Sequence, residues 1–169
     1  MKISKVTFIT QAAAIAAIYV VLTLVFAPIS YGEVQVRIAE ALTILPFFMP
    51  AAIPGLFIGC LIANTIGGSI ILDVIFGSIA TLLGAIGTWL LRKNRWLAPL
   101  PPIISNTIIV PLVLRFGYGV LLPLPLLMVF IAIGEIISCY VLGELLLSVL
   151  KPYAGRIFGT DSILNEKKK

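Results

Sequence analysis

Three charged residues, Glu33, Arg37 and Glu40, lie close together in an otherwise apolar part of the chain. Residues three or four apart share one face of a helix, so Arg37 and Glu40 face the same way. Glu33 shares this face as well if the helix already includes it, because it lies four residues before Arg37. A guanidinium and a carboxylate neutralise each other, yet this pairing leaves N–H donors and carboxylate lone pairs that need further partners. Such a group of side chains is suited to binding a small polar molecule.

The chain that carries these charges has the composition of a membrane protein. Of its 169 residues, 60% are hydrophobic and only 11% are charged, and its mean hydropathy is +1.16. A soluble domain of this length could not bury so much apolar surface, so we expect the lipid bilayer to be its solvent. An ionisable group within a membrane helix is costly, which makes it a candidate for a functional site.

Four further ionisable residues fall within apolar segments of the chain. Arg115 and Glu144 lie near the ends of their segments, where a long side chain reaches water or, for Glu144, pairs with a basic loop. Asp73 lies slightly too deep for a simple helix cap. Glu135 falls near the middle of its segment, where it either binds a ligand or hydrogen-bonds a neighbouring helix, for example through Asn106.

The elements that position these residues are six predicted helices, at about 6–26, 36–49, 51–66, 70–91, 100–116 and 122–149. They form an all-α six-transmembrane-helix bundle, which we expect to be a single integral membrane domain over residues 1–169. Pro50 and Pro54 place a sharp turn between the second and third helices. Ten of the twelve Lys and Arg residues fall on one side of this bundle, which predicts that both termini are cytoplasmic.

With this topology, the polar side chains gather in the outer half of the bundle. Carboxylates outnumber basic groups there, which favours a cationic ligand or a neutral ligand rich in N–H donors. Tyr31, Phe116 and Tyr118 lie in or beside the outer loops. The predicted substrate-binding residues are Glu33, Gln35, Arg37, Glu40, Asn64, Asp73, Asn106 and Glu135.

The sequence lacks the groups that most enzymes and metal sites need. It contains no histidine, and Cys60 and Cys139 lie inside apolar runs, which predicts neither a metal site nor a disulfide framework. We also find no nucleophile–base pair and no phosphate-binding glycine loop. The pattern therefore favours binding or transport over catalysis.

The first helix carries two rows of alanine at fourfold spacing, Ala12 with Ala16 and Ala13 with Ala17. Small residues let helix backbones approach closely in lipid, so this smooth face suits either the chain's own bundle or a separate membrane partner. The residues alone leave both possibilities open. Similar rows of small residues in the third and fourth helices are expected to pack internally.

A resemblance to a known family, QueT, is carried by three runs: VQVRIAEALTILPFFMPAAIPGLFIGCLIANTIGG, ILDVIFGSIATLLGAIGTWLLRK and PLPPIISNTIIVP. It covers about residues 5–150. Members of this family are the substrate-binding S components of energy-coupling factor (ECF) transporters, which are ABC importers. The resemblance implies that Ala12, Ala13, Ala16 and Ala17 dock onto a transmembrane coupling protein driven by two ATPases. It therefore implies no cofactor in this chain, because the partner subunits use the ATP.

The resemblance also implies a substrate and a location, namely a queuosine precursor and the bacterial cell membrane. The expected precursor is 7-aminomethyl-7-deazaguanine, whose N–H edge suits a carboxylate, whose carbonyl suits Arg37, and whose ammonium arm suits a second carboxylate. One alternative is an S component for another vitamin or purine-like micronutrient. Another is a stand-alone secondary carrier that uses Asp73 or Glu135 as a proton relay.

Overall fold

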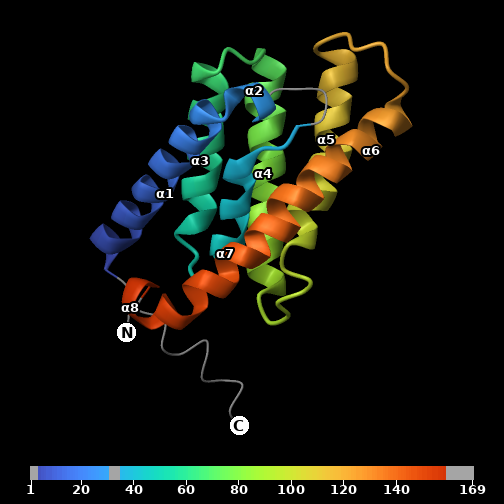
Figure 1. Ribbon diagram of the computed structural model, residues 1–169. Helices are drawn as coiled ribbons and strands as arrows, with labels where there is room; N and C mark the ends of the chain where they lie inside the picture. Colours follow the sequence, from blue (N-terminus) through green and yellow to red (C-terminus); the bar gives the residue numbers. More distant parts are fainter. Residues whose placement is uncertain (1–3, 31–34, 159–169) are drawn as a thin grey trace.

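The computed structural model describes residues 4–30 and 35–158, and this part of the chain is helical, with no strand (Figure 1). Glu33 lies outside the described residues. The elements are α1 (Lys5–Val25), α2 (Ala27–Ser30), η1 (Ile38–Phe47), α3 (Ala52–Ile66), α4 (Ile71–Leu91), α5 (Leu100–Phe116), α6 (Leu124–Glu135), η2 (Ile136–Leu142), α7 (Gly143–Leu150), η3 (Lys151–Tyr153) and α8 (Ala154–Phe158).

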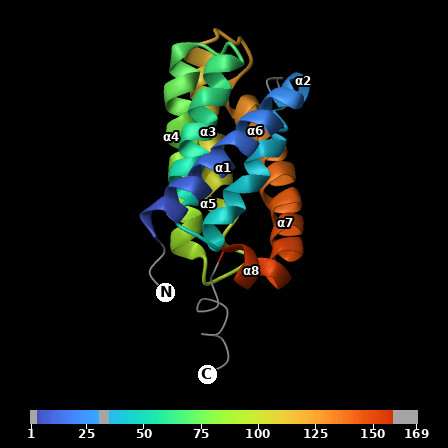
Figure 2. The ribbon, with the colours of Figure 1, turned by 90° about the vertical axis from the view of Figure 1, so that its left-hand side faces the viewer.

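All six predicted segments are helical, with bounds close to those expected. Three helices are long and apolar enough to cross a membrane, namely Lys5–Val25, Ile71–Leu91 and the continuous run Leu124–Phe158. The other three, η1, α3 and α5, are apolar but shorter. The beginning of α1 and the end of α8 lie at the same end of the bundle (Figures 1 and 2).

The second segment differs from the expected α-helix because η1 is a 3₁₀ helix with Pro46 inside it. A 3₁₀ helix rises about 2.0 Å per residue, against 1.5 Å for an α-helix, so ten residues reach further across the bundle. Every residue from Ala39 to Pro46 is buried. The element is enclosed by α1, α3, α4, η2 and α7, which it contacts on all sides (Figure 1).

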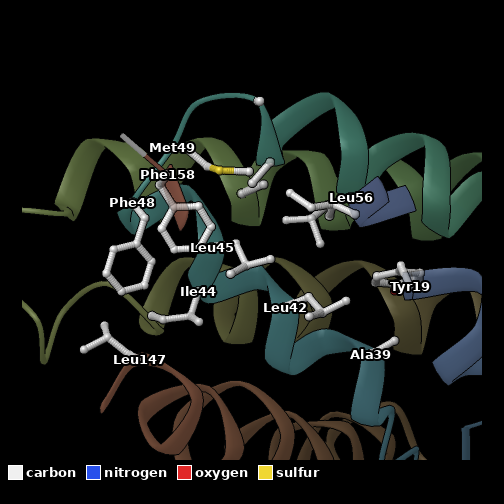
Figure 3. Close-up of a cluster of buried hydrophobic side chains, with 14 of the residues drawn as sticks. Tyr19, Ala39, Leu42, Ile44, Leu45, Phe48, Met49, Leu56, Leu147 and Phe158 are labelled. Atoms are coloured by element: carbon white, nitrogen blue, oxygen red, sulfur yellow. The ribbon is translucent and has the colours of Figure 1, made fainter. Parts of the chain in front are cut away.

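The apolar core surrounds the second half of η1. Figure 3 shows Leu42, Leu45 and Phe48 between residues of neighbouring helices, including Leu56 of α3 and Leu147 of α7. The ring of Phe48 stacks on Phe158, with the ring centroids 5.2 Å apart. This packing holds the lower part of η1 in place.

Helices α1 and α3 are in close contact through small residues. A Cβ atom added to Gly59 would lie 3.0 Å from the Ala16 Cα, and one added to Gly55 would lie 2.7 Å from the Ala12 carbonyl oxygen. The row Ala12–Ala16 therefore faces α3. Ala13 and Ala17 lie about 100° further around α1 and are exposed. The structure thus separates the two alanine rows of the predicted docking face.

The end of the bundle at which α1 begins and α8 ends also carries an ion pair. Arg95 Nε lies 2.6 Å from Glu144 Oε2, and Arg95 Nη2 donates to the Ser148 hydroxyl at 2.7 Å. The guanidinium of Arg92 lies 3.6 Å from the ring centroid of Trp89. The expected pairing of Glu144 with a basic loop is confirmed, so Glu144 belongs to this end and not to the ligand site.

Candidate functional site

Most of the buried polar side chains lie in the half of the bundle away from this ion pair. They come from the second half of α1, the beginning of η1, the end of α3, the first half of α4 and the junction of α6 with η2 (Figure 1). We use the name polar cluster for Tyr19, Arg37, Glu40, Thr43, Cys60, Asn64, Thr81, Glu135 and Cys139.

Glu40 lies at the centre of the polar cluster, with an exposed fraction of 1%. Its Oε1 accepts a short hydrogen bond from the Tyr19 hydroxyl, and the Thr81 hydroxyl lies 3.3 Å from the same oxygen. Its other oxygen, Oε2, is buried and has no hydrogen-bond partner among the described residues. A buried carboxylate oxygen without a donor is costly, which marks it as a site that a ligand can satisfy.

Arg37 and Asn64 meet at Cys60 on one side of Glu40. Arg37 Nη1 lies 3.9 Å from the Cys60 sulfur, and Asn64 Nδ2 lies 3.6 Å from the same atom. Arg37 also interacts electrostatically with Glu40 and Asp73. The carbonyl oxygen of the Asn64 side chain is buried and accepts no hydrogen bond in the described part of the chain. This side of the cluster therefore offers a second acceptor for a ligand.

Glu135 faces Glu40 from the other side, at the end of α6. The Cys139 thiol donates to Glu135 Oε2 at 3.1 Å, and the Asn106 amide lies beside the Glu135 carboxylate. Glu135 and Cys139 are four residues apart at the start of the π-helix η2. The Thr43 hydroxyl links η1 to η2, since it lies 2.6 Å from the Glu40 carbonyl oxygen and 3.5 Å from the Cys139 sulfur. Wide helical turns of this kind often occur at functional sites.

The segment before η1 passes unusually close to α6. A Cβ atom added to Gly134 would lie only 2.1 Å from the Gln35 carbonyl oxygen. Only glycine permits this approach, which brings Glu135, the next residue, towards η1. Gln35 is itself buried, with an exposed fraction of 8%.

Asp73 lies at the outer edge of the cluster and holds a loop. Its Oδ2 accepts a hydrogen bond from the Tyr118 hydroxyl at 3.1 Å, and the backbone N–H of Ile70 donates to that hydroxyl at 3.3 Å. Asn64 Nδ2 lies 3.4 Å from the Asp73 carbonyl oxygen. Tyr118 therefore ties the loop between α5 and α6 to the start of α4. Arg115 stabilises the same loop by donating to the Val120 carbonyl at 2.9 Å.

The structure brings most of the predicted site residues together. Arg37, Glu40, Asn64 and Glu135 lie in the polar cluster, and the remaining described ones border it: Gln35, Asp73 and Asn106. Five residues of the cluster are not among the predicted site residues: Tyr19, Thr43, Cys60, Thr81 and Cys139. The spacing in the sequence could have indicated two of them. Cys60 is four residues from Asn64 and Cys139 is four residues from Glu135, which places each pair on one helix face.

Glu40, Glu135 and Cys139 each offer one ligand atom, and these three atoms lie within 4.8 Å of one another. All three side chains are buried. The spacing can receive a cation between two carboxylates and a sulfur. That this position holds no metal ion stays a prediction.

Comparisons with known proteins agree with a transport function. The model of the family described as QueT transporter matches residues 9–152. Queuosine precursor transporter QueT from Lactococcus lactis subsp. cremoris (strain MG1363) is 40% identical over 85 residues, which are 49% of this chain and 50% of the relative. The match thus spans about half the length of that relative. No solved structure matched the chain.

The family match covers most of the chain, including every element of the polar cluster. Its description is that of a transporter and not of an enzyme, in agreement with the several apolar helices of a multi-pass membrane protein. The protein therefore belongs to the QueT transporter family.

Proposed function

We propose that the protein is the S component of an ECF-type importer in the bacterial cell membrane, and that it binds a queuosine precursor. The leading candidate substrate is 7-aminomethyl-7-deazaguanine. Family membership and a relative that is a queuosine precursor transporter support this proposal. The proposed topology has six spans and both termini in the cytoplasm, which puts the polar cluster in the half of the bundle nearer the cell exterior.

The observation that carries the proposal is the pair of buried acceptors in the polar cluster. Glu40 Oε2 and Asn64 Oδ1 both lack a hydrogen-bond donor among the described residues. The donors of 7-aminomethyl-7-deazaguanine match these acceptors, because the N–H edge of its ring suits Asn64 Oδ1 and its ammonium arm suits Glu40 Oε2, while Arg37 can donate to the ring carbonyl. A ligand of this kind offsets the cost of the two unsatisfied oxygens.

The burial of the polar cluster implies that the ligand enters only when an overlying segment moves. Glu40 and Asn64 have exposed fractions of 1% and 0%. The link from Tyr118 to Asp73 and Ile70 closes the loop between α5 and α6 over the start of α4. We propose that this link opens for ligand entry and closes again over the bound ligand.

The outward row of α1 is the proposed docking surface for the coupling protein. Ala13 and Ala17 are exposed, whereas Ala12 and Ala16 face α3. A smooth row of small residues permits close contact with another membrane helix. In this proposal the chain needs no cofactor, and two partner ATPases supply the energy.

Mass spectrometry of small molecules that co-purify with the protein tests the substrate. A deazaguanine supports the proposal, whereas a vitamin redirects it to another S component. Uptake into proteoliposomes tests the mechanism, with and without the coupling protein and ATPases. Uptake that requires the partner subunits supports the S-component role. Uptake by the chain alone contradicts it and favours a secondary carrier.

A further inference from the structure

We propose that Glu40, Glu135 and Cys139 form a subsite for a primary ammonium group, and that this subsite gives the protein its preference for a cationic ligand over a neutral ligand of the same shape. The inference rests on the proposed function, because it concerns the same ligand. It goes further by assigning the charged part of the ligand to particular atoms.

The ligand atoms of the three residues lie within 4.8 Å of one another, so a nitrogen atom between them can lie about 2.8 Å from each carboxylate oxygen and farther from the Cys139 sulfur. The shorter distance is the ordinary length of a hydrogen bond from an ammonium to a carboxylate. An ammonium has three N–H donors, and the subsite offers two carboxylate acceptors and the weaker sulfur acceptor. Glu40, with an exposed fraction of 1%, also keeps its Oε2 without a hydrogen-bond donor in the described part of the chain.

Buried carboxyl groups outnumber buried basic groups in this half of the bundle. Asp73, Glu40 and Glu135 lie near one buried guanidinium, that of Arg37, whereas Arg115 is only partly buried and donates to the Val120 carbonyl. Glu144 does not enter this balance, because Arg95 neutralises it at the other end. Buried charges need opposite charges close by, so an additional cation in the cluster is favourable. A ligand that carries its own ammonium group brings this charge with it.

The two sides of Glu40 suit different parts of the ligand. Asn64 and Arg37 lie on the α3 side of Glu40, whereas Glu135 and Cys139 lie on the η2 side. Neither α6 nor η2 carries a basic residue, and Arg37 reaches Glu135 only through an electrostatic interaction across the cluster, so this side suits the cationic arm. The α3 side has an amide and a guanidinium, which suit the edge and the carbonyl of the ring. Glu40 lies between the two sides. Its Oε1 has Tyr19 and Thr81 as partners, and its Oε2 has no partner among the described residues.

The test compares two ligands with the same ring, 7-aminomethyl-7-deazaguanine and its neutral analogue 7-hydroxymethyl-7-deazaguanine. Isothermal titration calorimetry on the purified full chain should give roughly 10- to 100-fold tighter binding of the aminomethyl ligand. Glu135→Gln keeps the shape of the side chain but removes its charge. It should reduce the ratio of the two affinities at least about 5-fold, chiefly by weakening the aminomethyl ligand. Glu144→Gln is the matched control, because that buried glutamate pairs with Arg95, and it should leave the ratio unchanged.

The outcomes separate this inference from the proposed function. Equal affinity of the wild-type protein for the two ligands overturns the ammonium subsite but leaves the proposed function in place, and this measurement needs no variant. Binding of neither deazaguanine overturns the proposed function itself. Loss of binding after treatment with a metal chelator also overturns the inference, because a metal ion then occupies the three atoms. An unchanged ratio in a folded Glu135→Gln protein excludes Glu135 from the subsite.

Discussion

Replacing Glu40 by glutamine should separate ligand binding from folding, because the two oxygens of Glu40 have different partners. The amide oxygen of glutamine can occupy the position of Oε1 and still accept from Tyr19 and Thr81. Its NH₂ group takes the position of Oε2, and a nearby acceptor is the Glu135 carboxylate, one oxygen of which lies within 4.8 Å of a Glu40 oxygen. We therefore expect the free energy of unfolding to fall by less than about 1 kcal/mol.

Ligand binding should respond much more strongly to this substitution. An NH₂ group cannot accept a hydrogen bond from the ligand, and the negative charge is lost as well. Losing one charge-assisted hydrogen bond costs about 1–3 kcal/mol, so the Kd for 7-aminomethyl-7-deazaguanine should rise roughly 5- to 150-fold. Isothermal titration calorimetry measures the Kd, and thermal unfolding in detergent measures the stability of the same sample.

Tyr19→Phe is the matched comparison for this experiment. It removes the donor to Oε1, the oxygen that faces away from the proposed ligand, and leaves a buried carboxylate poorly satisfied. We expect this variant to lose about 1.5–3 kcal/mol of stability. Unchanged affinity in a folded Glu40→Gln protein would refute the reasoning, and would reduce Glu40 to a structural partner of Tyr19.

Three further predictions concern the link between Tyr118 and Asp73, the two alanine rows and the close approach at Gly134. Tyr118→Phe removes the hydrogen bond to Asp73, and stopped-flow binding should show faster ligand dissociation; an unchanged rate contradicts the proposed closure. Ala13→Trp should leave ligand binding intact but abolish co-purification with the coupling protein, whereas Ala16→Trp should lower the thermal unfolding temperature, because Ala16 packs against α3. Gly134→Ala places a methyl group 2.1 Å from a carbonyl oxygen and should cost about 1–3 kcal/mol or more in thermal unfolding; a stable variant would show that the segment can shift.

The sequence predicted the helices and the general position of the site because both follow from simple patterns. Long apolar runs and prolines determine where the helices begin and end, and the structure agrees to within a few residues for most of them. Buried charges are costly, so Arg37, Glu40 and Glu135 could be singled out from their depth alone. The pairing of Glu144 with a basic loop followed from the same argument.

The inner arrangement of the site depended on contacts between helices, which local patterns do not specify. Tyr19 is 21 residues from Glu40, and nothing in the apolar sequence around it indicates that its hydroxyl points inward. The two alanine rows of α1 look equivalent in sequence. They differ only because Gly59 of α3 approaches one of them. The 3₁₀ geometry of η1 was likewise not predicted, because the apolar pattern of this segment also fits an α-helix.

The position of η1 is the reason why we expect folding and ligand binding to be separable in this protein. Its second half lies in the apolar core, where Phe48, the residue that follows it, stacks on Phe158. Its first half carries Glu40, whose side chain lies among polar groups from α1, α4 and α6. Because the core holds the element from below, the upper half can keep an unsatisfied carboxylate oxygen in place without a ligand. Packing in the core therefore offsets the free-energy cost of leaving this oxygen without a hydrogen bond. A ligand that donates to the oxygen removes that cost, which strengthens binding.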